Sequence, residues 1–280
     1  MLTPEVGLED FQNSLRGNLG CPAKLGSLLL EFVSSGGLTK EINGILTSLL
    51  NREAAVLSRI GTDMIMLLEN NDFVLQLKRF SGHDQSNVLV SPESFLCTPA
   101  SNAVLLLKGG GTIKTRRYKI DQNVDLDVFS PSAKIVLVEE LTYDGSVCHE
   151  QVSPPMVYEY VSEDSFVMIR LAYRPFADQC WHFNSASHIA AFPSAGLMDQ
   201  SALVNTAKVL GAIGDVGALP HLVELGTHPS HFVRWASIQA SGQIDRDVAI
   251  RLLMTATNDA HPHIRAMSTK TLIKLGHVHG

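Results

Sequence analysis

Apolar residues near the N-terminus recur at helical spacing. A first stripe contains Leu25, Leu29, Phe32 and Val33, and the run Ser34-Ser35-Gly36-Gly37 then interrupts the pattern. Thr39 is a favoured N-cap type for a second helix, whose apolar side we expect to carry Ile42, Ile45, Leu46, Leu49 and Leu50. Residues 1–62 thus predict a helical segment that packs against the next domain, with a partner-binding groove as the alternative.

From about residue 64 to residue 193 the pattern changes to short apolar runs separated by Gly, Pro, Asn, Asp and Ser. The clearest runs cover residues 73–80, 103–107, 112–120, 133–138, 156–160 and 165–173. Frequent turns without an intervening helix are typical of an antiparallel sandwich or barrel. We therefore expect residues 63–195 to form a β-domain, with a cupin or jelly-roll barrel as the leading fold.

The C-terminal region repeats with a period of 31 residues. The matching pairs are Gly211 and Gly242, Ile213 and Ile244, Ala218 and Ala249, Leu222 and Leu253, and Val233-Arg234 and Ile264-Arg265. Such a repeat predicts helical hairpins that bury their apolar faces by stacking on one another. Residues 199–277 resemble HEAT repeats of the bilin-lyase-like kind. The second unit departs from the first, with Ile244-Asp245-Arg246 in place of Ile213-Gly214-Asp215.

Composition limits the class of protein. A chain of 280 residues, 45% hydrophobic and with a net charge of −6, suits a globular protein of about two domains and argues against a general nucleic-acid binder. Its four cysteines lie far apart, so we expect reduced thiols rather than a disulfide framework. No apolar run is long enough to span a membrane, and the N-terminus lacks the pattern of a signal peptide. We expect a cytoplasmic protein.

Three segments of the β-region resemble the cysteine dioxygenase (thiol dioxygenase) branch of the cupins. They are Phe73-Val-Leu-Gln-Leu-Lys-Arg-Phe-Ser-Gly-His83, Val104–Gly109 followed by Thr115-Arg-Arg-Tyr118, and Leu171–Phe176 followed by Cys180-Trp-His-Phe183. The resemblance covers strand texture and turn positions over roughly 120 residues. It implies a cupin barrel after the N-terminal helices.

The resemblance also implies where iron ligands would stand. The family's His-x-His pair, counted back from Gly109, falls on Phe95 and Cys97, and its third histidine falls on Met156. The family's Ser-x-His-x-Tyr run falls on Ile169, Leu171 and Tyr173, and its substrate-binding arginine is missing near residues 63–65. Phenylalanine and methionine cannot supply the imidazole or carboxylate donors of such a site. We therefore expect a degenerate site that holds no metal or other cofactor.

Alternation along one strand suggests what replaced the site. Val167, Ile169, Leu171 and Tyr173 share one face, which we expect to line the barrel interior together with Phe95, Cys97 and Met156. We expect this interior to be packed solid; a small apolar ligand beneath the Tyr173 hydroxyl is the alternative.

Histidines offer two weaker candidates for a site. His83, His149, His182 and His188 could form a relocated metal site, although they lack ligand spacing on one strand. The histidines in or near the repeat turns are His221, His228, His231, His261 and His263, and solvated turn residues are the commoner explanation.

Two features of the predicted hairpin at residues 109–119 have ordinary explanations. Gly109-Gly110-Gly111 lacks the helix and Lys that a phosphate loop needs, so we expect a tight turn with positive φ. Lys114, Arg116, Arg117 and Lys119 split between two faces, which favours a solvated edge strand over an anionic partner surface.

These features predict an α+β protein in three parts: N-terminal helices (1–62), a degenerate cupin barrel (63–195) and HEAT-like repeats (199–280). The leading function is a non-catalytic binding module for a small ligand or a protein, with the repeats as the interaction or homo-oligomer surface and no nucleic-acid or membrane partner. A metal-dependent oxygenase with relocated histidines and a purely structural homo-oligomer are the alternatives.

Overall fold

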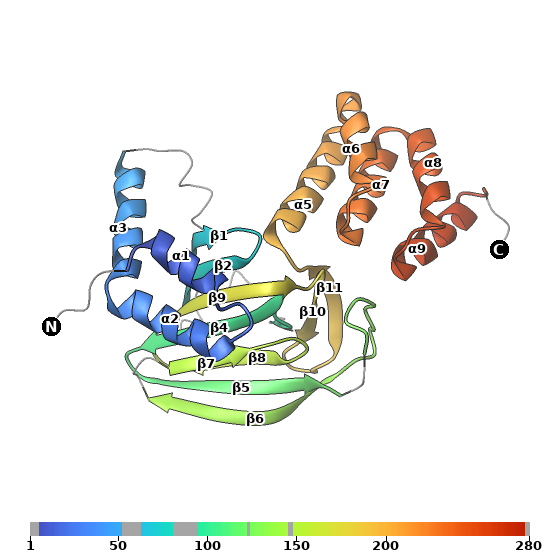
Figure 1. The fold of residues 1–280 in the computed structure, drawn as a ribbon. Coiled ribbons are helices and arrows are strands. Elements are labelled where there is room, and N and C mark those ends of the chain that lie inside the picture. Colours follow the sequence, from blue (N-terminus) through green and yellow to red (C-terminus); the bar gives the residue numbers. More distant parts are fainter. Residues whose placement is uncertain (1–5, 52–62, 81–94, 122–123, 145–147, 278–280) are drawn as a thin grey trace. The chain divides into compact units, whose positions relative to one another are not determined.

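The computed structural model describes residues 6–51, 63–80, 95–121, 124–144 and 148–277. It confirms the predicted α+β class, with N-terminal helices, antiparallel sheets and C-terminal helices (Figure 1). Contacts divide the described residues into two compact units. Those within 1–122, 133–176 and 183–189 form the first unit, and those within 123–132, 177–182 and 190–280 form the second.

The first unit begins with the helices α1 (Leu8–Arg16), α2 (Pro22–Ser34) and α3 (Gly37–Leu50). Proline opens α2, where its missing N–H and fixed φ suit the first helical turn. The rings of Phe11 and Phe32 stack with their centres 4.4 Å apart and join α1 to α2. The predicted packing of these helices against the next domain is confirmed, because their buried side chains cluster with those of a β-sheet.

The start of α3 differs from the prediction. Its N-cap is Gly36, which has a φ of +94°, rather than Thr39. A Cβ on Gly37 would overlap the carbonyl oxygen of Val6 and lie 2.6 Å from the Phe32 ring, so the chain needs glycine here for close approach. The predicted apolar side of α3 is also only partly buried, since Leu46 and Leu50 are exposed.

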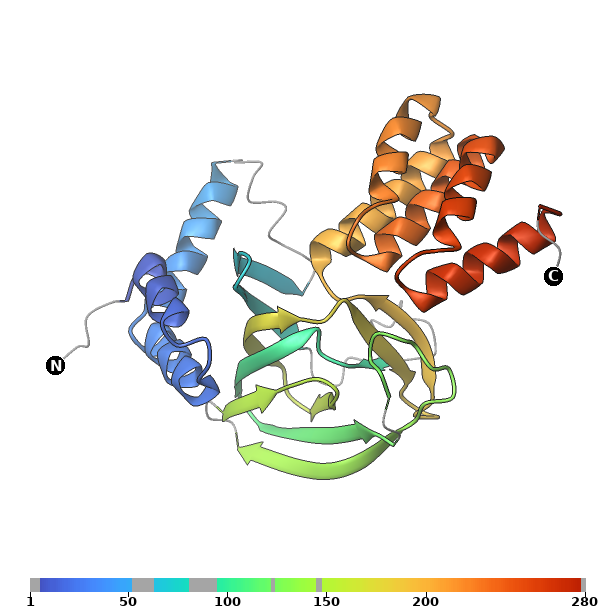
Figure 2. The ribbon, with the colours of Figure 1, turned by 45° about the vertical axis from the view of Figure 1, so that its right-hand side comes forward.

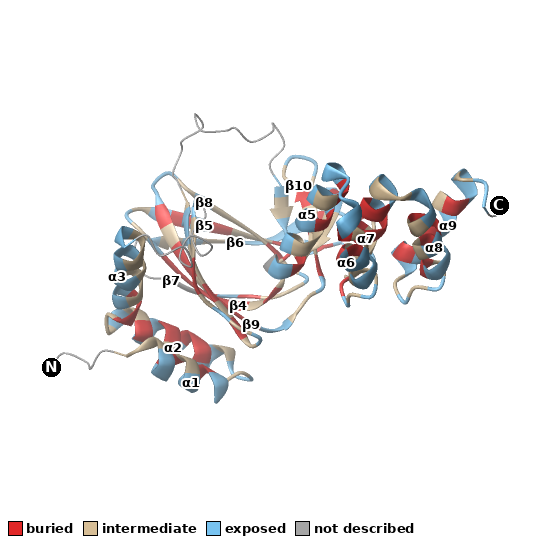
Figure 3. Ribbon diagram, turned by 90° about the horizontal axis from the view of Figure 1, so that it is seen from above, coloured by how far each residue is buried: buried red, intermediate tan, exposed pale blue. Residues whose placement is uncertain are grey.

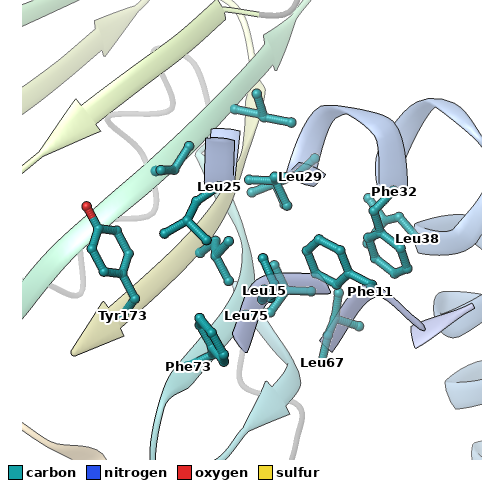
Figure 4. Close-up of a cluster of buried hydrophobic side chains, with 14 residues drawn as sticks. Phe11, Leu15, Leu25, Leu29, Phe32, Leu38, Leu67, Phe73, Leu75 and Tyr173 are labelled. Atoms are coloured by element: carbon teal, nitrogen blue, oxygen red, sulfur yellow. The ribbon is translucent and has the colours of Figure 1, made fainter. Parts of the chain in front are cut away.

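A five-stranded antiparallel sheet forms the centre of the first unit. Its strands, in spatial order, are β1 (Met64–Glu69), β2 (Phe73–Phe80), β9 (Phe166–Phe176), β4 (Ser101–Gly109) and β7 (Cys148–Val152). One face packs against α1, α2 and α3 (Figure 4). Because the other face is covered as well, β4 has an unbroken apolar run at residues 103–107 instead of alternating with polar residues.

The opposite face of this sheet meets a second antiparallel sheet. That sheet contains β6 (Ile135–Asp144), β5 (Thr112–Ile120) and β8 (Val157–Ser162), in the order β6-β5-β8. Leu105 of β4, Ile113 of β5 and Met168 of β9 belong to the apolar cluster between the two sheets. The short strand β3 (Phe95–Cys97) is also part of this unit.

The turn between β4 and β5 uses glycine for space. None of Gly109, Gly110 and Gly111 has a positive φ, so that expectation was wrong. A Cβ on Gly111 would overlap the carboxylate of Asp164, and one on Gly109 would lie 2.9 Å from the Cβ of Phe166.

The second unit contains paired strands and a helical array. β10 (Gln179–Asn184) pairs with β11 (Ala190–Ala195). The array, visible in Figure 2, consists of α5 (Met198–Ile213), the 3₁₀ turn η2 (Val216–Ala218), α6 (Leu219–Leu225), α7 (His231–Ile244), α8 (Arg246–Ala256) and α9 (Pro262–Lys274). The helices bury one side each, as Figure 3 shows for α7 and α8.

The two repeat joints differ as their sequences do. α5 ends at Gly214 in the left-handed conformation, with a φ of +75°. α7 ends at Asp245, which is extended and whose carboxylate accepts hydrogen bonds from the backbone N–H groups of Asp247 and Val248. Asp245 therefore ends one helix and caps the next, so the second repeat needs no glycine at this joint. Within the described ranges, no helix is long and apolar enough to cross a bilayer.

Candidate functional site

The predicted pocket face of β9 lies against the N-terminal helices. Ile169, Leu171 and Tyr173 share one face, as expected, but they cluster with Leu25 of α2 and the rest of the helical core, and Val167 packs beside them (Figure 4). The barrel interior is instead reached by the alternate residues of β9, among them Met168. The predicted orientation was therefore wrong: this face is covered by helices rather than by the second sheet.

The other predicted pocket residues do not join that face. Phe95 and Cys97 lie on β3, where both retain exposed surface, and Met156 is half-buried just before β8. Packing around Cys97 raises the pKa of its thiol, against the opposing charges of nearby Lys78 and Arg170. Arg170 points to the side of β9 opposite to Leu171, and Cys97 lies near Arg170. Cys97 and Leu171 therefore lie on different sides of the sheet, and the seven predicted residues do not form one pocket.

A charged pair missed by the sequence analysis joins the two sheets. Glu150 of β7 has a fully buried side chain, and its Oε1 accepts a hydrogen bond from Nε of Arg117 on β5 at 3.0 Å. Burial raises the pKa of Glu150, while Arg117 opposes that rise. Tyr160 lies beside this pair, and burial followed by the charge of Glu150 raises the pKa of its hydroxyl. The cluster neutralises its own charges inside the unit.

The basic strand β5 was predicted to be an edge strand, but it lies between β6 and β8. The predicted split between faces is confirmed for the two arginines. On the face opposite to Arg117, Nε of Arg116 contacts Glu140 at 2.8 Å and its Nη1 contacts Glu159 at 3.4 Å. Carboxylates on neighbouring strands therefore pair with both arginines, so neither is free to bind an anion.

Of the four histidines considered for a relocated metal site, His182 and His188 have described side chains, and these two have separate surroundings. His83 lies outside the described residues, as does the side chain of His149. Nε2 of His182 is 2.8 Å from Oγ of Ser194, and its ring stacks on Phe192. His188 instead packs its ring on Tyr118. In the described part of the chain, no three His, Cys, Asp or Glu side chains are grouped as metal ligands would be.

Two turn histidines of the repeats are not solvated as expected. His231 is 6% exposed, and its ring stacks on His261 with centres 3.7 Å apart. Nε2 of His261 lies 2.8 Å from the carbonyl oxygen of Asp127. Burial, followed by the nearby charges of His261 and Arg234, lowers the pKa of His231 to about 4. This pair therefore helps to hold residues near 127 against the array.

An arginine anchors each repeat turn in the same way. Nη1 of Arg234 donates to the carbonyl oxygens of His228 and Pro229 at 2.8 and 2.7 Å. Nη1 of Arg265, 31 residues later, donates to those of Asp259 and Ala260, both at 2.7 Å. The period found in the sequence thus repeats a hydrogen-bonding arrangement as well as a packing pattern.

Two grooves mark the surface of the array. One, of about 570 Å³, lies between α6 and α8 and is lined by Leu219, Pro220, Val223, Val248, Arg251, Leu252 and Thr255. The other, of about 800 Å³, lies along α9 and is lined by Thr257, Pro262, Arg265, Ala266, Thr269, Lys270, Ile273 and Lys274. The sequence analysis did not identify these surfaces, because helical periodicity finds the buried stripe and not the space between neighbouring helices.

Comparison with known proteins supports the repeat assignment. Residues 195–273 match a family model described as HEAT repeats. A search of curated proteins finds no significant match.

Solved structures with a weak likeness to part of this chain include a dioxygenase and a protein with a cupin domain. Hydroquinone 1,2-dioxygenase from Sphingomonas sp. TTNP3 is 16% identical, over 44% of this chain and 71% of that chain, with a TM-score of 0.29. A cupin-2 domain containing protein from Shewanella frigidimarina is 10% identical, over 44% of this chain and 91% of that chain, with a TM-score of 0.25.

Proposed function

We propose that this protein is a non-catalytic binding module that engages a protein partner through its helical repeats. The groove between α6 and α8 is the observation that carries the proposal. Aliphatic side chains such as Val223 and Leu252 line it, and Val223 is 42% exposed. Exposed apolar grooves between helices are a common docking surface for protein segments.

The two-sheet unit suits a scaffold in this proposal. Its buried carboxylate, Glu150, is paired with Arg117, and the face of β9 that contains Leu171 is filled by helices. A small apolar ligand beneath Tyr173 is not retained, because that side chain is itself 6% exposed within the packed cluster. We propose that this scaffold derives from the cysteine dioxygenase branch of the cupins, which its sequence resembles.

A photo-reactive amino acid placed at Val223 tests the proposal in extract of the source cells. We expect a cross-linked product of one defined mass, which an excess of unlabelled wild-type chain removes and an excess of the Val223→Asp chain does not. The same amino acid at Val136, an exposed position on β6, is the control and should give no such product.

The mass of the product also identifies the class of partner. A product of twice the chain's own mass would replace the proposal with the homo-oligomer alternative. Equal products at Val223 and Val136, or none at Val223, would refute the use of this groove.

A further inference from the structure

The guanidinium of Arg234 has two kinds of partner in the repeat array, backbone carbonyl oxygens and a carboxylate. Its Nη1 is anchored by the turn carbonyls of its own repeat, and its Nε and Nη2 hold the carboxylate of Asp259 at 2.7 and 2.6 Å. Asp259 comes from the turn of the following repeat. Fork-to-fork pairing of this kind is directional and strong for a charged contact.

Arg265 has the first of these partners but not the second. Its Nη1 is anchored by the carbonyl oxygens of Asp259 and Ala260, just as that of Arg234 is anchored one repeat earlier. Among the residues that the structure describes, no carboxylate is bonded to Arg265, and its side chain is exposed along the α9 groove. The arginine is thus held in a carboxylate-binding pose.

The rest of the α9 groove has the same charge. Lys270 and Lys274 line it with Arg265, and none of its eight lining residues is acidic. The two lysines are four positions apart on one helix face, where like charges repel. A bound anion would relieve that repulsion. Pro262, Ala266 and Ile273 add apolar surface between the cations.

We propose that the α9 groove binds an acidic amphipathic protein segment, one carboxylate of which pairs with Arg265 as Asp259 pairs with Arg234. This inference rests on the proposed function, because it names the chemistry of the partner that the repeats engage. The apolar lining favours a peptide over a nucleic acid, since none of the lining residues is an aromatic on which bases could stack.

Selection from a random library of peptides about 12 residues long, near the length at which isolated helices become marginal, tests the proposal on the full chain. We expect wild-type protein to enrich sequences that combine Asp or Glu with Leu-type residues. The best peptide, measured by fluorescence anisotropy, should bind Arg265→Ala about tenfold more weakly, or about 1.4 kcal/mol. Arg265→Lys should be intermediate, because it keeps the charge and loses the fork.

Arg265→Ala also removes two turn hydrogen bonds, so a second variant separates binding from folding. The double variant Lys270→Glu, Lys274→Glu removes no side-chain hydrogen bond of the described residues and should lose binding while retaining its helical circular dichroism. Lys208→Glu, an exposed cation on α5 outside both grooves, is the matched control and should bind as wild type does.

Three results would overturn the inference: enriched peptides without acidic residues, equal binding by all variants, or displacement of the peptide by duplex DNA at equal concentration. If the cross-link at Val223 forms while acidic peptides fail, only this inference is lost. If both fail, the proposed function is lost as well.

Discussion

Arg117 contacts two carboxylates that differ in their surroundings. Glu150 has a fully buried side chain, whereas Glu139, which contacts Nη1 of Arg117 at 2.7 Å, is 45% exposed. Alternation predicted that Arg116 and Arg117 point to opposite faces, and the structure confirms this. The partners could not be predicted, because Glu150 is 33 residues away and reaches Arg117 only through the pairing of β7 with β4.

Removing Arg117 should be costly because it leaves a buried carboxylate without its cation. We expect Arg117→Met to lower the free energy of unfolding by about 3 kcal/mol, measured by urea denaturation. The double variant with Glu150→Gln should recover most of this loss. Arg116→Met, on the more exposed face, is the control and should cost no more than about 1 kcal/mol. Equal losses for the two single variants would contradict a structural role of the buried pair.

Element boundaries were predicted best where turn residues flank an apolar run. The bounds of β2 and β5 agree with the predicted runs at residues 73–80 and 112–120. β10 and β11 were not predicted as separate strands because neither contains a long apolar run. The predicted pocket failed for a related reason: alternation on β9 shows which residues share a face but not what covers that face.

Two glycines of α3 offer a test at the level of the element. A Cβ on Gly37 would collide with Val6 and Phe32, so Gly37→Ala should lower the melting temperature. Gly44 lies within the same helix with no atom near its Cβ position, and alanine is the better helix former by about 1 kcal/mol. Gly44→Ala should therefore raise the melting temperature. A higher melting temperature for Gly37→Ala, together with a lower one for Gly44→Ala, would contradict the close packing at the start of α3.

At the scale of the molecule, the helical repeats were predicted from their 31-residue period and the β-region from apolar runs separated by turn residues, and the HEAT match confirms the repeats. Contacts group residues 124–132 and 177–182 with the repeats, which no local pattern could show. Hydrogen bonds explain part of this grouping: Nε1 of Trp181 donates to the carbonyl oxygen of Leu126 at 2.9 Å, and Nε2 of His261 in the repeats lies 2.8 Å from that of Asp127. Such contacts join residues far apart in the chain and leave no periodic signal.

The buried ring of His231, stacked on His261, should make the second unit sensitive to acid. The pKa of His231 is about 4 in the fold and near 6.5 in an unfolded chain, so folding excludes its proton. His261, His263 and Arg234 disfavour the charged form, while Asp259 favours it. The stability that the neutral ring contributes is complete above about pH 6.5 and is lost as pH falls toward 4. We expect the melting temperature to decrease over that window.

Replacing His231 should remove part of this pH dependence. His231→Gln should flatten the decrease in helical melting temperature between about pH 6.5 and 4, because the side chain no longer titrates. His221→Gln, at an exposed position of α6, is the control and should leave the slope unchanged. An unchanged slope in His231→Gln would assign the acid sensitivity to other groups.

The bond between Arg234 and Asp259 has a consequence for how such an array changes in length. Because it links the turn of one repeat to the turn of the next, a chain shortened before Asp259 would leave Arg234 held by His228 and Pro229 with its remaining nitrogens vacant. Arg265 already stands in that state at the end of the described array. Gain or loss of a repeat during evolution would therefore make or break one such bond at each joint, so every joint could keep the same charged link whatever the number of repeats.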